Sequence, residues 1–128
     1  MGNGTSIGRV RGLGSALEGT HHWWQQRLTA GANLALMLWL IASLVLLPSL
    51  DYATVQAWLA SPLAAVPMIL LVISVFYHLK LGLQVVIEDY ERDARRIVLM
   101  TLLNFFAIAA AVFAIFSILK ISLTGAAA

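Results

Sequence analysis

One histidine and one lysine lie inside an apolar stretch that is long enough to cross a lipid bilayer. The stretch runs from residue 62 to residue 90, carries His78 and Lys80 within it, and ends in two acidic residues followed by Tyr90. An ionisable side chain at that depth is costly to keep in hydrocarbon and usually has a functional role. These residues are therefore the first candidates for chemistry.

Four residues of this stretch have the spacing of one helix face. Gly82, Val85 and Asp89 follow His78 at four, seven and eleven residues, so all four share a stripe. Imidazole is a common axial ligand of haem iron, and a glycine one turn further along lets a flat macrocycle lie against the backbone. The stripe is a candidate cofactor face. Lys80 projects roughly 200° from His78 and faces away from it.

Each of these residues also has a structural interpretation. His78 can be a packing histidine bonded to a backbone carbonyl, and Gly82 can serve close helix packing. Tyr90 can be an ordinary interfacial aromatic residue, with Asp89 paired to an arginine of the following turn. The residue types alone leave both alternatives open.

The composition indicates a membrane protein. Of the 128 residues, 61% are hydrophobic and 11% charged, whereas about a quarter of the residues in a soluble domain are charged. The absence of cysteine excludes disulfides, thiolate metal sites and cysteine-ligated iron–sulfur clusters in this chain. The length suits one small bundle and is too short for a membrane bundle plus a catalytic domain.

The sequence predicts an all-α integral membrane protein with three transmembrane helices in a single domain, residues 1–128. About 20 apolar residues are needed to span ~30 Å of hydrocarbon. Between the first two spans, Asp51 is expected to cap a short surface helix. The predicted elements are a surface tail, 1–20, and helices over about 22–47, 62–88 and 97–120.

The basic residues predict the side on which each terminus lies. They gather before the first span and in the loop after the second: Arg9, Arg11, Arg27, Arg92, Arg95 and Arg96. Short loops rich in Lys and Arg stay on the cytoplasmic side. We therefore expect the N-terminus inside and the C-terminus outside, with His78 roughly 15 Å below the inner surface.

Two motifs together carry a resemblance to a known family. The first is RLTA, residues 27–30, at the head of the first predicted helix, and the second is His78-x3-Gly82-x6-Asp89-Tyr90. This pairing resembles the smaller hydrophobic membrane anchor subunits of succinate dehydrogenase, respiratory complex II. The likeness covers about residues 8–120, including helix number and topology, and the lead-in is similar to the alphaproteobacterial and mitochondrial-like branch.

The resemblance implies roles for five residues. His78 matches the axial ligand of a b-type haem, whose other ligand comes from a histidine of the larger cytochrome b anchor subunit. Tyr90 and Asp89 match the pair at the ubiquinone site, where the tyrosine hydroxyl bonds a quinone carbonyl. Arg27 matches a basic residue near the haem propionates, with a topology determinant as the alternative. His21 corresponds to another propionate neighbour, but a second adjacent histidine leaves the register open.

The function implied by the resemblance is that of a membrane anchor subunit of succinate:ubiquinone oxidoreductase. Such a chain would share one haem b with the larger anchor subunit, help to form the ubiquinone site and dock the iron–sulfur subunit. Flavin chemistry would belong to the flavoprotein subunit, because this chain has no dinucleotide-binding glycine motif. The implied location is the bacterial inner membrane, ahead of the mitochondrial inner membrane.

Two alternatives stay open. The anchor of a fumarate reductase would run the reverse reaction, and sequence does not distinguish the direction. A small homo-oligomeric transporter would use His78 and Lys80 to line a polar pathway. A transporter should have polar stripes on several facing helices, and we expect the first and third spans to offer almost none.

Overall fold

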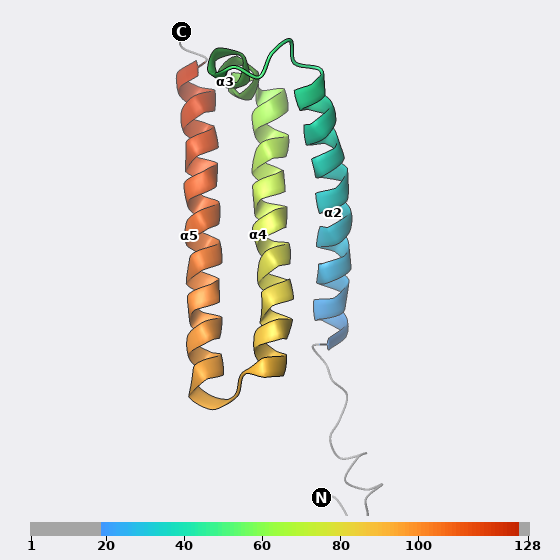
Figure 1. Ribbon diagram of the computed structural model, residues 1–128, viewed down its shortest axis with the longest axis vertical. Coiled ribbons are helices and arrows are strands. Elements are labelled where there is room, and N and C mark those ends of the chain that lie inside the picture. Colours follow the sequence, from blue (N-terminus) through green and yellow to red (C-terminus); the bar gives the residue numbers. More distant parts are fainter. Residues whose placement is uncertain (1–18, 126–128) are drawn as a thin grey trace, which may run out of the picture.

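The computed structural model describes residues 19–125, which are helical apart from short connections (Figure 1). Three of the helices are long and apolar enough to cross a membrane. This confirms the predicted all-α membrane protein with three transmembrane helices, while the side on which each terminus lies stays a prediction. In chain order the helices are α2 (Gly19–Val45), α3 (Tyr52–Ala60), α4 (Pro62–Tyr90) and α5 (Asp93–Gly125).

The long helices differ from the expected ranges mainly at their ends. Helix α2 begins before residue 22, and α5 extends past both ends of the range 97–120. The apolar run marks only the part of a helix that lies in hydrocarbon, whereas the backbone stays helical through the polar residues on either side. Of the predicted tail, residues 1–18 lie outside the described residues.

The three long helices form a flat layer with α4 in the middle (Figure 1). Helix α4 contacts α2 on one side and α5 on the other, and α3 packs across the ends of α4 and α5. Few side chains are buried, and several are small, which allows α4 and α5 to approach closely. The buried residues are Ala64, Ala65, Leu71, Leu81, Leu103, Ala107 and Ile118. Both faces of the layer are thus open to lipid or partner chains.

The short helix α3 begins as predicted, with Asp51 as its N-cap. The Asp51 carboxylate accepts the backbone N–H of Thr54 at 2.9 Å. A hydrogen bond from the Ser49 hydroxyl, followed by that N–H, lowers the pKa of Asp51 from 3.8 to about 2. Trp58 of α3 stacks on Trp39 of α2, with ring centroids 6.0 Å apart. The cap and the stacked rings fix the loop between the first two spans.

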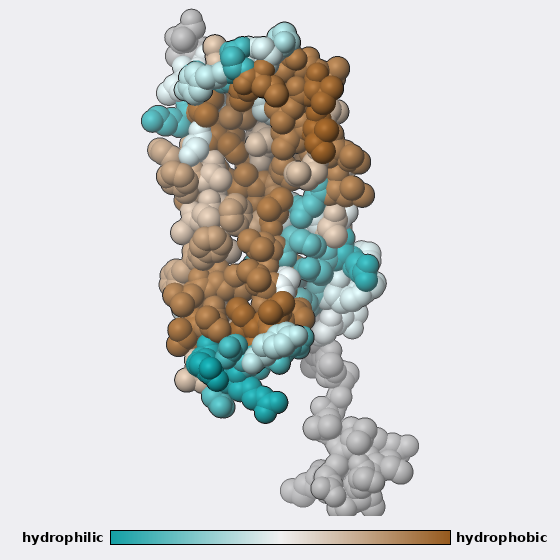
Figure 2. Space-filling model, in the orientation of Figure 1, coloured by the Kyte–Doolittle hydropathy of each residue, from teal (hydrophilic) through white to brown (hydrophobic). Residues whose placement is uncertain are grey.

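The surface is apolar over most of the layer and hydrophilic at its two ends (Figure 2). On the face shown, a further hydrophilic strip follows the groove between α4 and the N-terminal half of α2. Polar groups at that depth need partners, because hydrocarbon supplies no hydrogen bonds. The groove between α2 and α4 is therefore the candidate site.

Candidate functional site

A polar stripe on α2 faces α4 along this groove. Its members follow each other at four, three and four residues, which places them on one helix face: His22, Gln26, Thr29 and Asn33. Three of their polar atoms are buried without a hydrogen-bond partner among the described residues: His22 Nε2, Gln26 Oε1 and Asn33 Oδ1. The expectation that the first span offers almost no polar residues is wrong for its N-terminal half. The spacing of these four residues in the sequence already predicts a polar helix face.

His78 of α4 meets this stripe directly. Its Nδ1 lies 2.9 Å from Oγ1 of Thr29. Four residues earlier on α4, the Ser74 hydroxyl donates to the carbonyl of Thr29 at 3.4 Å. The partner of His78 is therefore a side-chain hydroxyl across the helix contact, not a backbone carbonyl. Two polar contacts hold α2 and α4 in register at this level.

Beside His78 lies a cavity of about 550 Å³, within the ~300–1,000 Å³ typical of ligand pockets. Its walls come from α2 and α4 alone: Gly19, His22, Trp23, Gln26, Arg27, Ala30, His78, Gly82 and Val85. The stripe predicted from His78, Gly82 and Val85 is thus brought together at one cavity. With walls from two helices only, the cavity can be completed by another chain.

Gly82 keeps part of this cavity open. A methyl group at its Cα would meet only Nε2 of Gln26, at 3.6 Å, which is an ordinary van der Waals contact. The glycine is therefore not required by tight packing of α2 against α4. Its lack of a side chain instead leaves space in the wall of the cavity, one turn from His78.

Arg27 places a fixed positive charge at the same cavity. Its guanidinium carbon lies 5.3 Å from the centroid of the Trp23 ring, so the two side chains form a cation–π pair. A guanidinium is always charged and matches carboxylate oxygens with two parallel N–H groups. The cavity thus has an anion-binding group at its wall.

The residues around the cavity suit a haem bound from one side. An imidazole can ligate iron, the gap at Gly82 admits a flat ring, and Arg27 suits propionate groups. No cluster of three or more metal-ligating side chains occurs within residues 19–125. Two imidazoles of the described residues line this cavity, those of His22 and His78.

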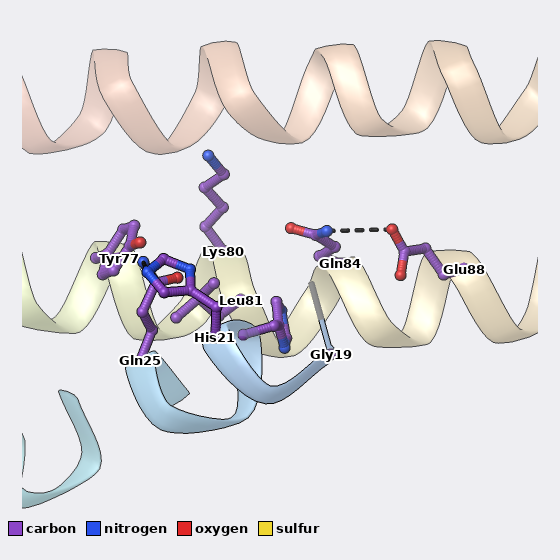
Figure 3. Close-up of a pocket in the computed structure, with 9 residues that line it drawn as sticks. Gly19, His21, Gln25, Tyr77, Lys80, Leu81, Gln84 and Glu88 are labelled. Atoms are coloured by element: carbon purple, nitrogen blue, oxygen red, sulfur yellow. Dashed lines mark hydrogen bonds between the residues drawn. The ribbon is translucent and has the colours of Figure 1, made fainter. Parts of the chain in front are cut away.

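A neighbouring cavity of about 430 Å³ takes up His21 and Lys80 (Figure 3). Gln25, Tyr77, Gln84 and Glu88 also line it. Lys80 extends from α4 toward α5, and it does not line the His78 cavity, as its place on the helix predicts. His21 is likewise absent from the His78 cavity, whereas His22 lines both cavities.

Asp89 and Tyr90 are the last two residues of α4, roughly 16–18 Å along the helix from His78. Tyr90 is 83% exposed. Two of the three arginines that follow α4 pair with other carboxylates: Arg96 with Glu88 at 3.4 Å, and Arg95 with Glu91 at 3.5 Å. Within residues 19–125, Asp89 takes part in neither ion pair. Both side chains remain available at the end of the helix, apart from the His78 cavity.

Comparison with known proteins gives a consistent family. The family described as succinate dehydrogenase/fumarate reductase transmembrane subunit matches residues 1–116. A succinate dehydrogenase hydrophobic membrane anchor subunit from Rickettsia bellii is 38% identical over 84 residues, which cover 66% of this chain and 67% of the relative. The protein of the same name from Rickettsia conorii is 40% identical over 86 residues, covering 66% and 68%.

A third relative of that name, from Rickettsia felis, is 39% identical over 74 residues, covering 57% of this chain and 61% of the relative. No solved structure matches the chain significantly. The family match spans most of the sequence, including α2, α4 and most of α5. The chain belongs to the family of transmembrane subunits of succinate dehydrogenase and fumarate reductase.

Proposed function

We propose that this chain is the smaller membrane anchor subunit of a succinate:ubiquinone oxidoreductase, where it supplies one side of a haem b site and part of the ubiquinone site. The observation that most supports this role is the cavity that His78 shares with Arg27 and Gly82 inside the membrane-spanning layer. Membership of the family indicates the complex to which the chain belongs. The cavity indicates which residues would contact a cofactor.

In the haem site, His78 would ligate the iron together with a histidine of the larger anchor subunit. Arg27 would hold the propionates by charge and hydrogen bonds. The propionate role that the resemblance gives to His21 suits His22 better, because His22 lines the His78 cavity and His21 lines only the neighbouring one. Haem b supplies a one-electron redox centre when bound. This chain holds it, orients its ligand and balances its charge.

In the ubiquinone site, the Tyr90 hydroxyl donates a hydrogen bond to a quinone carbonyl, which gains negative charge on reduction. Ionised Asp89 has no proton to donate, so it holds a cation or passes protons to the quinone. Both residues lie at the end of α4 that the basic residues predict to face the cytoplasm. The iron–sulfur subunit docks at this inner surface of the bacterial membrane, and the flavoprotein subunit oxidises succinate.

A fumarate reductase anchor is the second candidate, because the family description covers both enzymes. The three relatives carry the name succinate dehydrogenase, which favours succinate oxidation. Membership of this family argues against the small homo-oligomeric transporter. Proteins of this family are subunits of a larger complex, so other subunits can complete a cavity that this chain forms only in part.

The haem role is tested by replacing His78 with alanine in the purified complex. The reduced-minus-oxidised b-type absorption band should be lost, and assembly should weaken because bound haem stabilises the folded state. Tyr77→Ala is the matched control, since it removes a neighbouring ring of α4 that does not line the His78 cavity. A His78→Ala complex with an unaltered b-type spectrum would remove His78 from the haem site.

The quinone role is tested by replacing Tyr90 with phenylalanine. A hydrogen bond to a charged group contributes about 1.5–3 kcal/mol, so quinone reduction should fall roughly 10- to 150-fold. Succinate oxidation by an artificial soluble acceptor should persist. Tyr52→Phe is the control, because Tyr52 is 80% exposed at the other end of the layer. Equal rates of quinone reduction in both variants and the unaltered complex would refute the assignment.

A further inference from the structure

The hydroxyl of Thr29 has one proton and three polar neighbours. Its Oγ1 lies 2.8 Å from the carbonyl oxygen of Gln25, 3.2 Å from that of Gln26 and 2.9 Å from Nδ1 of His78. The two carbonyls belong to the preceding turn of α2 and can only accept hydrogen bonds. At these distances the Thr29 hydroxyl oxygen and a carbonyl oxygen repel each other unless a proton lies between them.

The number of protons favours one direction for the hydrogen bond between Thr29 and His78. The hydroxyl proton goes to the nearer carbonyl, that of Gln25, with the Gln26 carbonyl as a secondary acceptor. The lone pairs of Oγ1 are then left to face the imidazole. Those lone pairs can accept a hydrogen bond from His78 when the imidazole carries its proton on Nδ1. A neutral imidazole protonated at Nδ1 has its free lone pair on Nε2.

We propose that Thr29 is the positioning residue that fixes His78 as its Nδ1–H tautomer and thereby assigns Nε2 as the iron-binding atom. This inference rests on the haem role proposed for His78. A ligating histidine generally donates its other N–H to a carboxylate, a carbonyl or water, which orients the ring and tunes its basicity. Here a threonine of the neighbouring transmembrane helix performs that task.

The type of acceptor determines how strongly His78 donates electrons. A hydroxyl is a weaker acceptor than a carboxylate and carries no charge, so it leaves the imidazole close to neutral. Two hydrogen bonds form a chain, from His78 to the Thr29 hydroxyl and from that hydroxyl to the Gln25 carbonyl. Each bond polarises the other and strengthens it. Without the hydroxyl, Nδ1–H would lose its acceptor and the imidazole would donate less to iron. Oxidised iron would then lose more stabilisation than reduced iron, and the midpoint potential of the haem would rise.

Thr29 also ties the ligand to the register of the two helices. The Ser74 hydroxyl donates to the Thr29 carbonyl at 3.4 Å, so the backbone and the side chain of one residue both contact α4. A helix shift that carried Thr29 away would release the ring of His78 at the same time. Orientation of the ligand is therefore coupled to α2–α4 packing.

The test uses Thr29→Val in the assembled complex, since valine keeps the branched shape and removes the hydroxyl. Loss of a residue that orients a metal ligand should weaken haem retention by roughly tenfold, measured as transfer of haem to excess apomyoglobin. The haem midpoint potential, measured by redox titration, should rise. Thr29→Ser keeps the hydroxyl and should retain both values of the unaltered complex.

Thr101→Val is the matched control. The Thr101 hydroxyl makes the same type of bond within its own helix, to the Ile97 carbonyl at 2.9 Å, and it is exposed on α5. This variant should leave the potential unchanged. If Thr29→Val does not assemble, Thr29→Ala compared with Thr29→Ser gives the same contrast.

The outcomes separate this inference from the haem role itself. If His78→Ala removes the haem while Thr29→Val has the potential of the unaltered complex, the positioning role of Thr29 is wrong and the ligand role of His78 stands. A weaker haem retention without a shift in potential would likewise reduce Thr29 to a packing residue. If His78→Ala keeps its haem, the proposed ligand fails first, and the inference fails with it.

Discussion

The space left by Gly82 can be filled in steps, which makes it a direct test of the cavity. In Gly82→Ala, the new methyl group would meet Nε2 of Gln26 at 3.6 Å, an ordinary contact. Alanine also favours helix over glycine by up to ~0.8–1.0 kcal/mol. We therefore expect Gly82→Ala to assemble as well as the unaltered chain and to retain its haem.

Gly82→Leu should behave differently, because its three further carbons must extend into the cavity that His78 lines. Overfilling a packed site costs typically 1–3 kcal/mol. If that cost is borne by the bound cofactor, haem binding weakens roughly 5- to 150-fold. Since only the cavity is filled, α2 and α4 should remain packed and the complex should still assemble.

The assay is the ratio of haem to flavin in the purified complex, with copurification of the other subunits as the measure of assembly. We expect full haem in the Gly82→Ala complex and little haem in the Gly82→Leu complex. A leucine variant with full haem would show that the cavity is not the cofactor face. If alanine loses as much haem as leucine, the backbone at Gly82 matters, not the space beside it.

Three further predictions concern the cavity wall and the loop between α2 and α3. Arg27→Gln should lower haem retention roughly tenfold, because a charged hydrogen bond to a propionate is lost. The haem retention of Arg27→Lys should lie between that of Arg27→Gln and that of the unaltered complex. His22→Ala should lower the haem-to-flavin ratio while His21→Ala should not, since only His22 lines the His78 cavity. Asp51 should titrate at about pH 2 by carbon-13 NMR. Its folded pKa lies below its ordinary 3.8, so its stabilising effect is present above about pH 4 and is lost as the pH falls through about 2.

Sequence predicts the helices of this chain well, because each depends on local chemistry. Lipid requires every backbone group to be satisfied within its own segment, so an apolar run of sufficient length becomes a helix. Asp51 caps α3 through a contact only three residues away. The stripe of His78, Gly82 and Val85 depends on helix geometry alone, and the cavity brings those three together.

The polar stripe of α2 was harder to predict because its meaning depends on a second helix. Sequence places Gln26, Thr29 and Asn33 on one face, but near the end of a span such residues also suit the membrane interface. Only the packing of α4 shows that Thr29 meets His78. The same holds for the histidine doublet, where one residue of helix rotation decides which ring enters the cavity.

The polar stripe links the stability of this chain to its assembly. Each buried polar atom without a partner costs about 1–3 kcal/mol, and lipid offers no hydrogen bonds to offset that cost. His22, Gln26 and Asn33 each carry such an atom among the described residues, in a layer that buries few apolar side chains of its own. A partner helix, a cofactor edge or trapped water that reaches the groove would satisfy these groups. These three residues thus lower the stability of the isolated layer. The same residues would give a partner that reaches the groove specific hydrogen bonds to make.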